Sequence, residues 1–114
     1  MPSLDAVQGE QYLYLTTIGR KTGRLHEIEI WFVVHRHSFY IFAEGFDRAD
    51  WVRNVAHTPH VRVRVGGRIL EATAAALDQE RDAGEWTIVQ DLARAKYGWG
   101  DGLPVRITPS EPGA

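Results

Sequence analysis

The 114-residue sequence contains no cysteine, which excludes disulfide bridges, zinc–thiolate centres, iron–sulfur clusters and a cysteine nucleophile. It also lacks any apolar run close to the ~20 residues that a membrane-spanning helix needs. No basic stretch followed by an apolar one opens the chain, so no secretory signal is visible and a cytoplasmic location is expected. The formal net charge is only −2, and no overall basic field indicates a nucleic-acid partner.

The amino acids that are present are those of an average soluble globular protein, with 44% hydrophobic and 25% charged residues. A chain of this length is expected to fold as one domain around one hydrophobic core. We therefore expect a single domain over residues 1–114, with an ordered core of about residues 10–109 and loose, polar ends.

Alternation of apolar and polar residues runs through most of the chain and predicts β-strands. Six are expected, over residues 12–17, 26–35, 39–44, 60–65, 68–77 and 103–107, the last as an edge strand. A short helix is predicted over residues 49–57, and a longer C-terminal helix over residues 78–95 with Asp78 as its N-cap. This order predicts a mainly β (α+β) fold, a six-stranded antiparallel barrel with one short inserted helix and one longer C-terminal helix.

The second predicted strand presents a continuous apolar face formed by alternate residues from His26 to Val34. Its other face ends in Trp31 and Val33, which have to be covered by a helix, a ligand or a second subunit. We expect a second subunit here, and hence a homodimer.

The loop from Gly19 to Arg24 concentrates three cations and a hydroxyl group between two glycines. Glycines allow backbone N–H groups to converge on an anion, and arginine offers a forked donor to phosphate or carboxylate. The glycine spacing and the lack of a following helix exclude a nucleotide-binding P-loop. The loop is therefore either an anion-binding site or a solvated hairpin loop.

Other candidate sites have simpler interpretations. The five histidines share no ligand spacing with acidic residues, so no metal site is expected. Glu27 and Glu29 are expected to face solvent or pair with arginines rather than act as an acid–base pair. Arg62, Arg64 and Arg68 are expected to form a charged strand face rather than a nucleic-acid site. No serine lies in a nucleophile elbow, and no catalytic residue is assigned.

Aromatic residues gather near the C-terminus. Trp86, Tyr97 and Trp99 are accompanied by several glycines. Such a segment is suited to stacking on flat rings, and we interpret it as an irregular loop.

Residues 15–23, Leu-Thr-Thr-Ile-Gly-Arg-Lys-Thr-Gly, resemble the opening motif of the deazaflavin (F420)-dependent nitroreductase and quinone-reductase family. Later segments follow in the family's order: Glu44-Gly45, a helix with Trp51 and Asn54, and a closing Leu-Pro-Val at residues 103–105. The resemblance covers residues 12–108. It implies a split β-barrel related to flavin-binding pyridoxamine-phosphate oxidases. It also implies F420 as the hydride donor to quinones, nitro compounds or other activated acceptors.

The same resemblance implies which residues form the site. Those matched to the cofactor are Arg20, Lys21, Thr22, Gly23, His26, Ala43, Glu44, Gly45, Trp51 and Asn54. The loop would hold the cofactor's phosphate or acidic tail, and Ala43–Gly45 would border its ring system, supported by Trp51 and Asn54. Tyr97 and Trp99 would face the substrate. Because the cofactor carries the hydride chemistry, the protein need not supply an acid or base.

Two positions depart from the family pattern. His26 stands where relatives often carry an arginine, and Ala43-Glu44 replaces a Ser-Lys pair. We expect Glu44 to point away from the cofactor or to pair with Arg48. Two alternatives stay open: an FMN-binding split-barrel protein, and a barrel that binds a cofactor or hydrophobic ligand without turnover.

Overall fold

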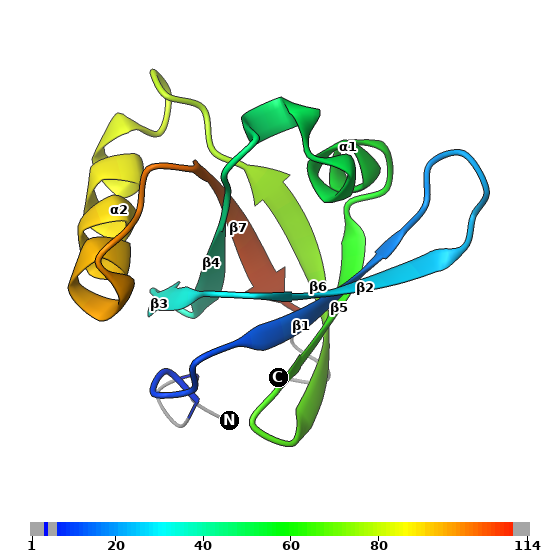
Figure 1. The fold of residues 1–114 in the computed structure, drawn as a ribbon, viewed down its shortest axis with the longest axis horizontal. Helices are drawn as coiled ribbons and strands as arrows, with labels where there is room; N and C mark the ends of the chain where they lie inside the picture. Colours follow the sequence, from blue (N-terminus) through cyan, green and yellow to red (C-terminus); the bar gives the residue numbers. More distant parts are fainter. Residues whose placement is uncertain (1–3, 5–6, 111–114) are drawn as a thin grey trace.

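The computed structural model describes Leu4 and residues 7–110, which form one antiparallel seven-stranded sheet with two α-helices (Figure 1). The strands are β1 (Leu13–Ile18), β2 (Leu25–Ile30), β3 (Val33–His35), β4 (Ser38–Ala43), β5 (His60–Val65), β6 (Arg68–Ala76) and β7 (Leu103–Pro109). The helices are a 3-10 turn η2 (Phe46–Arg48), α1 (Asp50–His57) and α2 (Ala83–Tyr97). The predicted mainly β fold with a short and a longer helix is confirmed, with seven strands instead of six.

The order of the strands explains why the sheet curls. It runs β2-β1-β5-β6-β7-β4-β3, so β2 and β3 are the two opposite edges. A flat sheet of this size would separate its edges by about 29 Å, at ~4.8 Å per strand. Only Trp31 and Phe32 connect β2 to β3, and they span at most ~11 Å. The sheet must therefore curl until its edges meet, which makes it a split half-barrel.

The predicted strand over residues 26–35 is thus two strands, and the break has a clear cause. The N–H of Phe32 donates to Tyr97 Oη at 3.1 Å. The carbonyl oxygen of Phe32 accepts hydrogen bonds from Tyr97 Oη at 2.8 Å and Lys96 Nζ at 3.1 Å. Side chains of α2 satisfy the backbone where a neighbouring strand otherwise would. The apolar face is also less buried than predicted, since His26 is exposed and Ile28 and Ile30 are only half-buried.

The β5–β6 hairpin agrees with its prediction. Val61, Val63 and Val65 are buried and the arginines between them are exposed. Gly66 and Gly67 connect the strands with φ of 55° and 78°, the left-handed values that favour glycine in a two-residue turn. Local turn chemistry and strand periodicity were sufficient here.

The last strand is not an edge strand, contrary to the prediction. β7 lies between β4 and β6 and pairs with both. Pro104 favoured an edge position because proline lacks the N–H that a ladder uses. The structure accommodates it: its carbonyl oxygen accepts the N–H of Leu77 at 3.0 Å.

The longer helix begins five residues later than predicted, at Ala83 instead of residue 78. The Asp78 carboxylate accepts the N–H groups of Glu80 and Arg81 at 2.9 and 2.8 Å, which closes a separate turn. The helix extends to Tyr97 and ends at Gly98, whose φ of 78° is typical of a helix C-terminus. Trp86 and Tyr97 are therefore helical, and the irregular loop begins only after them.

Two groups of buried side chains hold the fold together. One fills the half-barrel and includes Phe39 and Val63, with Val55 of α1 closing one end. The other lies between α2 and the outer face of β3 and β4, and it includes Val33 and Val89. Because α2 covers Val33, the apolar face that suggested a second subunit is largely covered by the chain itself.

The N-terminal residues partly correct the expectation of loose ends. Leu4 and Val7 are buried against the inside of the half-barrel. Residues 1–3, 5–6 and 111–114, which the expectation also included, lie outside the described residues. In the part of the chain that is described, no helix is long and apolar enough to cross a membrane.

Candidate functional site

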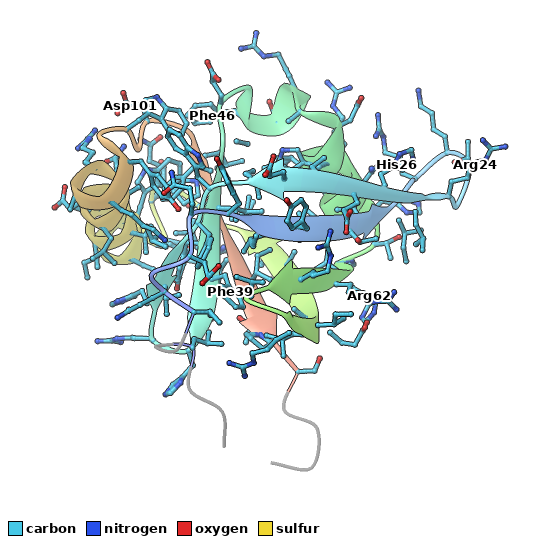
Figure 2. The ribbon with its side chains drawn as sticks, turned by 60° about the horizontal axis from the view of Figure 1, so that its bottom comes forward. Arg24, His26, Phe39, Phe46, Arg62 and Asp101 are labelled. Atoms are coloured by element: carbon cyan, nitrogen blue, oxygen red, sulfur yellow. The ribbon has the colours of Figure 1, made fainter. Side chains whose placement is uncertain are left out.

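A cation-rich groove of about 500 Å³ lies between the β1–β2 loop and α1. Figure 2 shows Arg24 and His26 at the far tip of this hairpin, and Asp101 at the opposite end of the molecule beside α2. The lining residues are Thr17, Gly19, Arg20, Lys21, Thr22, Arg24, His26, Ile28, Asp50, Trp51 and Asn54. The structure therefore brings six of the ten residues expected at the cofactor into one groove.

Asn54 attaches the loop to α1. It is 5% exposed, and its Oδ1 accepts the N–H of Arg20 at 3.2 Å and Arg20 Nη1 at 2.9 Å. Its amide nitrogen donates to Thr17 Oγ1 at 3.3 Å. We expected Asn54 beside Ala43–Gly45, but its hydrogen bonds connect it to the loop. The side chain holds Arg20 in a fixed orientation at the floor of the groove.

Some hydrogen-bond donors of the loop are already used within the protein, and others are free to bind a ligand. The N–H of Gly19 bonds to the Arg24 carbonyl oxygen at 2.7 Å, and the N–H of Gly23 to the Gly19 carbonyl oxygen at 2.8 Å. These two glycines therefore close the turn. The sequence suggested that their N–H groups could bind an anion, but both groups are already occupied. Within the described residues, the side chains of Lys21 and Arg24 form no ion pair. The cations, rather than the glycine N–H groups, are available to an anion.

His26 depends on a glycine for its place. A Cβ at Gly19 would lie 2.8 Å from His26 Nε2 and 3.1 Å from the Arg24 carbonyl oxygen. A side chain at position 19 would displace the imidazole, so glycine lets the ring lie this close to the backbone just after β1. Glycine is therefore needed at position 19 for the close contact with His26, because its φ is not positive.

An aromatic cavity of about 580 Å³ is the second concave feature. Its lining residues are Tyr12, Glu29, Ile30, Trp31, Phe42, Glu44, Ala93, Tyr97 and Trp99. Trp31 and Tyr97 stack with ring centroids 4.4 Å apart and planes 5° from parallel. Trp99 meets Phe42 edge to face at 6.5 Å. Four sequence segments therefore contribute flat apolar surfaces to one cavity.

The hydroxyl group of Tyr97 is not available to a ligand. Besides its contacts with Phe32, it lies 2.8 Å from the Gln11 carbonyl oxygen. Burial raises the pKa of this phenol above its ordinary value. The ring of Tyr97, not its hydroxyl, is what the residue presents to the cavity.

Glu44 lies exposed at the rim of the aromatic cavity. The expected ion pair with Arg48 does not form between these two described residues; Arg48 Nε instead donates to the Gly45 carbonyl oxygen at 3.5 Å. Ala43 is buried, and neither it nor Gly23 or Gly45 lines either of the two cavities.

Sequence reasoning missed several lining residues. Tyr12 and Phe42 look like ordinary strand residues, and nothing in their local pattern distinguishes them. Trp31 gave a signal, an outward aromatic residue that needed cover, although its partner proved to be Tyr97. The interpretation of Glu27 was correct: it pairs with Arg64 at 3.3 Å.

A curled antiparallel half-barrel of this topology, with a cationic groove beside an aromatic cavity, defines a class by its fold, the split β-barrel proteins. Within this class, the family model for F420H(2)-dependent quinone reductase matches residues 4–109, and the chain belongs to that family. It is therefore a reductase, of a family that uses F420.

Solved structures with low sequence identity share the fold. HutZ, the heme storage protein from Vibrio cholerae, has a TM-score of 0.74 at 18% identity, over 91% of this chain and 84% of that one. An FAD-binding protein from Mesorhizobium loti has a TM-score of 0.72 at 14% identity, over 97% and 91%. An F420-H2-dependent reductase, FDR-A, has a TM-score of 0.62 at 24% identity, over 89% and 95%. No curated protein sequence matches the chain.

The donors in the groove fit F420, whose phosphate and acidic tail are anionic. The ammonium of Lys21 and the guanidinium of Arg24 form no ion pair with any described residue. The Arg20 guanidinium is held by Asn54 at 2.9 Å and by Asp50 at 3.5 Å. Forked and point-charge donors of this kind recognise phosphate and carboxylate groups.

Proposed function

We propose that this protein transfers a hydride from reduced F420 to a quinone, a nitro compound or another activated acceptor. The observation that carries the proposal is the adjacency of the two cavities on one strand. Ile28 lines the cationic groove and Ile30 lines the aromatic cavity. Residues two apart on a strand are about 7 Å apart, so a ligand with an anionic tail and a flat ring can reach both.

Each part of the site has its own task in this proposal. Arg20, Lys21 and Thr22 bind the phosphate or acidic tail, and Asn54 keeps Arg20 in place. Gly23 shapes the turn, and His26 packs against Gly19. When bound, reduced F420 supplies the hydride.

The aromatic cavity orients the flat rings. Trp31, Tyr97 and Trp99 offer ring faces and edges to the substrate and reduce its contact with water. Glu44, which lines the cavity, borders the ring system, and its neighbours Ala43 and Gly45, which line neither cavity, support it from behind. Trp51 lines the groove. No side chain of the chain is assigned as a catalytic acid or base.

The experiment that tests this proposal is a titration of the purified protein with F420, followed by fluorescence. We expect Lys21→Ala to weaken binding at least about tenfold, because a charge-assisted contact is worth ~1.5–3 kcal/mol. The melting temperature should stay unchanged, since Lys21 is exposed. Arg62→Ala is the matched control: Arg62 is an exposed cation that pairs with Glu71 at 2.8 Å and lines neither cavity.

Three results would change the assignment. Equal affinities of wild type and Lys21→Ala would leave the loop as ordinary surface. Binding of FMN in place of F420 would move the protein to the flavin-binding branch of this fold. Tight F420 binding without turnover of quinones or nitroaromatics would favour the barrel that binds but does not catalyse.

We also propose that the protein is a homodimer with a small-molecule substrate. Trp31 remains 40% exposed although Tyr97 stacks on one face of it. A structure described as a domain-swapped dimer shares the fold with a TM-score of 0.62 at 24% identity. Sedimentation at micromolar concentration should give twice the chain mass of 12.9 kDa, and a monomer would contradict the proposal.

A further inference from the structure

The charge of the aromatic cavity is opposite to that of the groove. Glu29 and Glu44 are the charged residues that line it, and the lining residues within the described chain include no lysine, arginine or histidine. The groove next to it carries Arg20, Lys21 and Arg24. The cavities are therefore suited to groups of different charge.

Neither carboxylate of the cavity is paired with a cation among the described residues, so both can attract a positively charged ligand. Glu29 accepts one hydrogen bond, from the Tyr14 hydroxyl at 3.2 Å, while the nearby Arg64 pairs with Glu27. Glu44 forms no ion pair with any described residue. A negative potential at the cavity rim is the consequence.

One cation, Lys96, lies behind the aromatic stack but outside the cavity. Lys96 Nζ lies 5.1 Å from the centroid of the Tyr97 ring. It donates to the carbonyl oxygens of Gln8 and Glu10, each at 2.8 Å, and of Phe32 at 3.1 Å. Its hydrogen bonds turn it toward the backbone, and it does not line the aromatic cavity.

The aromatic walls favour the same kind of ligand. The faces of tryptophan and tyrosine rings carry negative electrostatic potential and attract cations. Trp31 is 40% exposed, so one side of the Trp31–Tyr97 stack is open to a ligand. Stacking selects a flat ring, and the ring faces with the two carboxylates select positive charge.

We propose that the aromatic cavity takes a flat aromatic ring that carries positive charge, in preference to a neutral or anionic ring of the same size. The proposal rests on the proposed function in one respect: such a ring would be the hydride acceptor. The selection itself needs only the cavity, so it can be measured without the cofactor.

Three ligands with the same three-ring skeleton test the proposal: N-methylphenazinium, phenazine and phenazine-1-carboxylate. Their dissociation constants are measured by quenching of tryptophan fluorescence at low salt and checked by calorimetry. We expect the cation to bind about tenfold more tightly than the neutral ring, from two exposed charge contacts and one cation–π contact. The anion should bind most weakly. At 1 M salt the preference should shrink, because the screening length falls to ~3 Å.

Matched variants assign the preference to the cavity. Glu29→Gln and Glu44→Gln should each lower the preference for the cation about two- to fivefold. Glu80→Gln is the control: it removes the same charge from an exposed glutamate that lies outside the cavity and forms no ion pair with any described residue, so it should leave the preference unchanged. Equal affinities for the three ligands, or an undiminished preference for the cation in the Glu29→Gln/Glu44→Gln double variant, would overturn the proposal.

Titration of the same samples with F420 separates this proposal from the proposed function. Selective binding of the cation without F420 binding would leave the cavity assignment intact and refute the cofactor. F420 binding together with equal affinities for the three phenazines would support the cofactor and refute the charge preference of the cavity.

Discussion

Asn54 gives the sharpest test of how the site is held together. Asn54→Ala removes three hydrogen bonds at once, two to Arg20 and one to Thr17. The bonds at 3.2 and 3.3 Å are long, and we count them at about 0.5 kcal/mol each. The bond to the Arg20 guanidinium is charge-assisted and counts about 1.5 kcal/mol. Together they predict a loss of about 2–3 kcal/mol in the free energy of unfolding.

A loss of this size is easily measured in a chain of 114 residues. At about 4 °C per kcal/mol, the melting temperature should fall by about 8–12 °C, followed by circular dichroism. Urea unfolding should show a lower midpoint with an unchanged slope. Binding of F420 should weaken as well, because Arg20 loses the contact that fixes it.

Two further variants make the test specific. Asn54→Asp keeps both acceptor contacts, and the Thr17 hydroxyl can turn to donate to the carboxylate, so the loss should stay below about 1 kcal/mol. Arg53→Ala changes the neighbouring residue of α1, an exposed side chain with one hydrogen bond to the Asp47 carbonyl oxygen, and should cost no more than about 0.5 kcal/mol. If Asn54→Ala melted within about 2 °C of the wild type, the loop would not depend on Asn54 and the reasoning would be refuted.

Three other predictions concern charge and packing around the site. Glu85 accepts hydrogen bonds from the Tyr40 hydroxyl and from Arg106 at 2.8 Å; burial opposes its ionisation, but these bonds outweigh burial and lower its pKa below 4.5. The folded state therefore binds a proton at Glu85 less readily than the unfolded state does. The stability that Glu85 contributes is present above pH 4.5 and is lost as the pH falls through the folded-state pKa. Urea unfolding should show that the free energy of unfolding decreases less between pH 7 and pH 3 in Glu85→Gln than in the wild type. Gly19→Ala should displace the His26 ring and lower the free energy of unfolding by about 1 kcal/mol. Gly84→Ala should stabilise α2, because an added Cβ there meets nothing within 4 Å. Thermal melts should therefore show a lower melting temperature for Gly19→Ala and a higher one for Gly84→Ala. Glu44→Lys should tighten F420 binding by a few-fold to about tenfold at low salt and less at high salt, and weaker binding would mean that Glu44 makes a favourable contact with the cofactor.

The features that the sequence alone determined are those that local chemistry specifies. The β5–β6 hairpin follows from alternating valines and a Gly-Gly turn, because a strand's period and a two-residue turn involve only neighbouring residues. The cationic loop and the short helix after it were recognised from composition and motif. The family resemblance agreed with the family model, because its motifs are short and their order in the chain can be read directly.

The tertiary structure decided where the strands end and how they are ordered in the sheet. The alternation over residues 26–35 continues through Phe32, and only Lys96 and Tyr97, about 65 positions away, explain why the strand ends there. β7 is an interior strand because it pairs with both β4 and β6, whereas the proline in its sequence suggested an edge. A periodic pattern reports which way a side chain points, but not which distant backbone group will need a partner.

The site itself depended most on the tertiary structure. Asn54 and Arg20 are 34 positions apart, and their contact exists only because α1 closes the end of the half-barrel beside the β1–β2 loop. The aromatic cavity joins Trp31 at the strand break to Tyr97 at the end of α2. The sequence singles out each of these residues but does not show which of them meet; the curl of the sheet, imposed by the two-residue connection between its edges, brings them together.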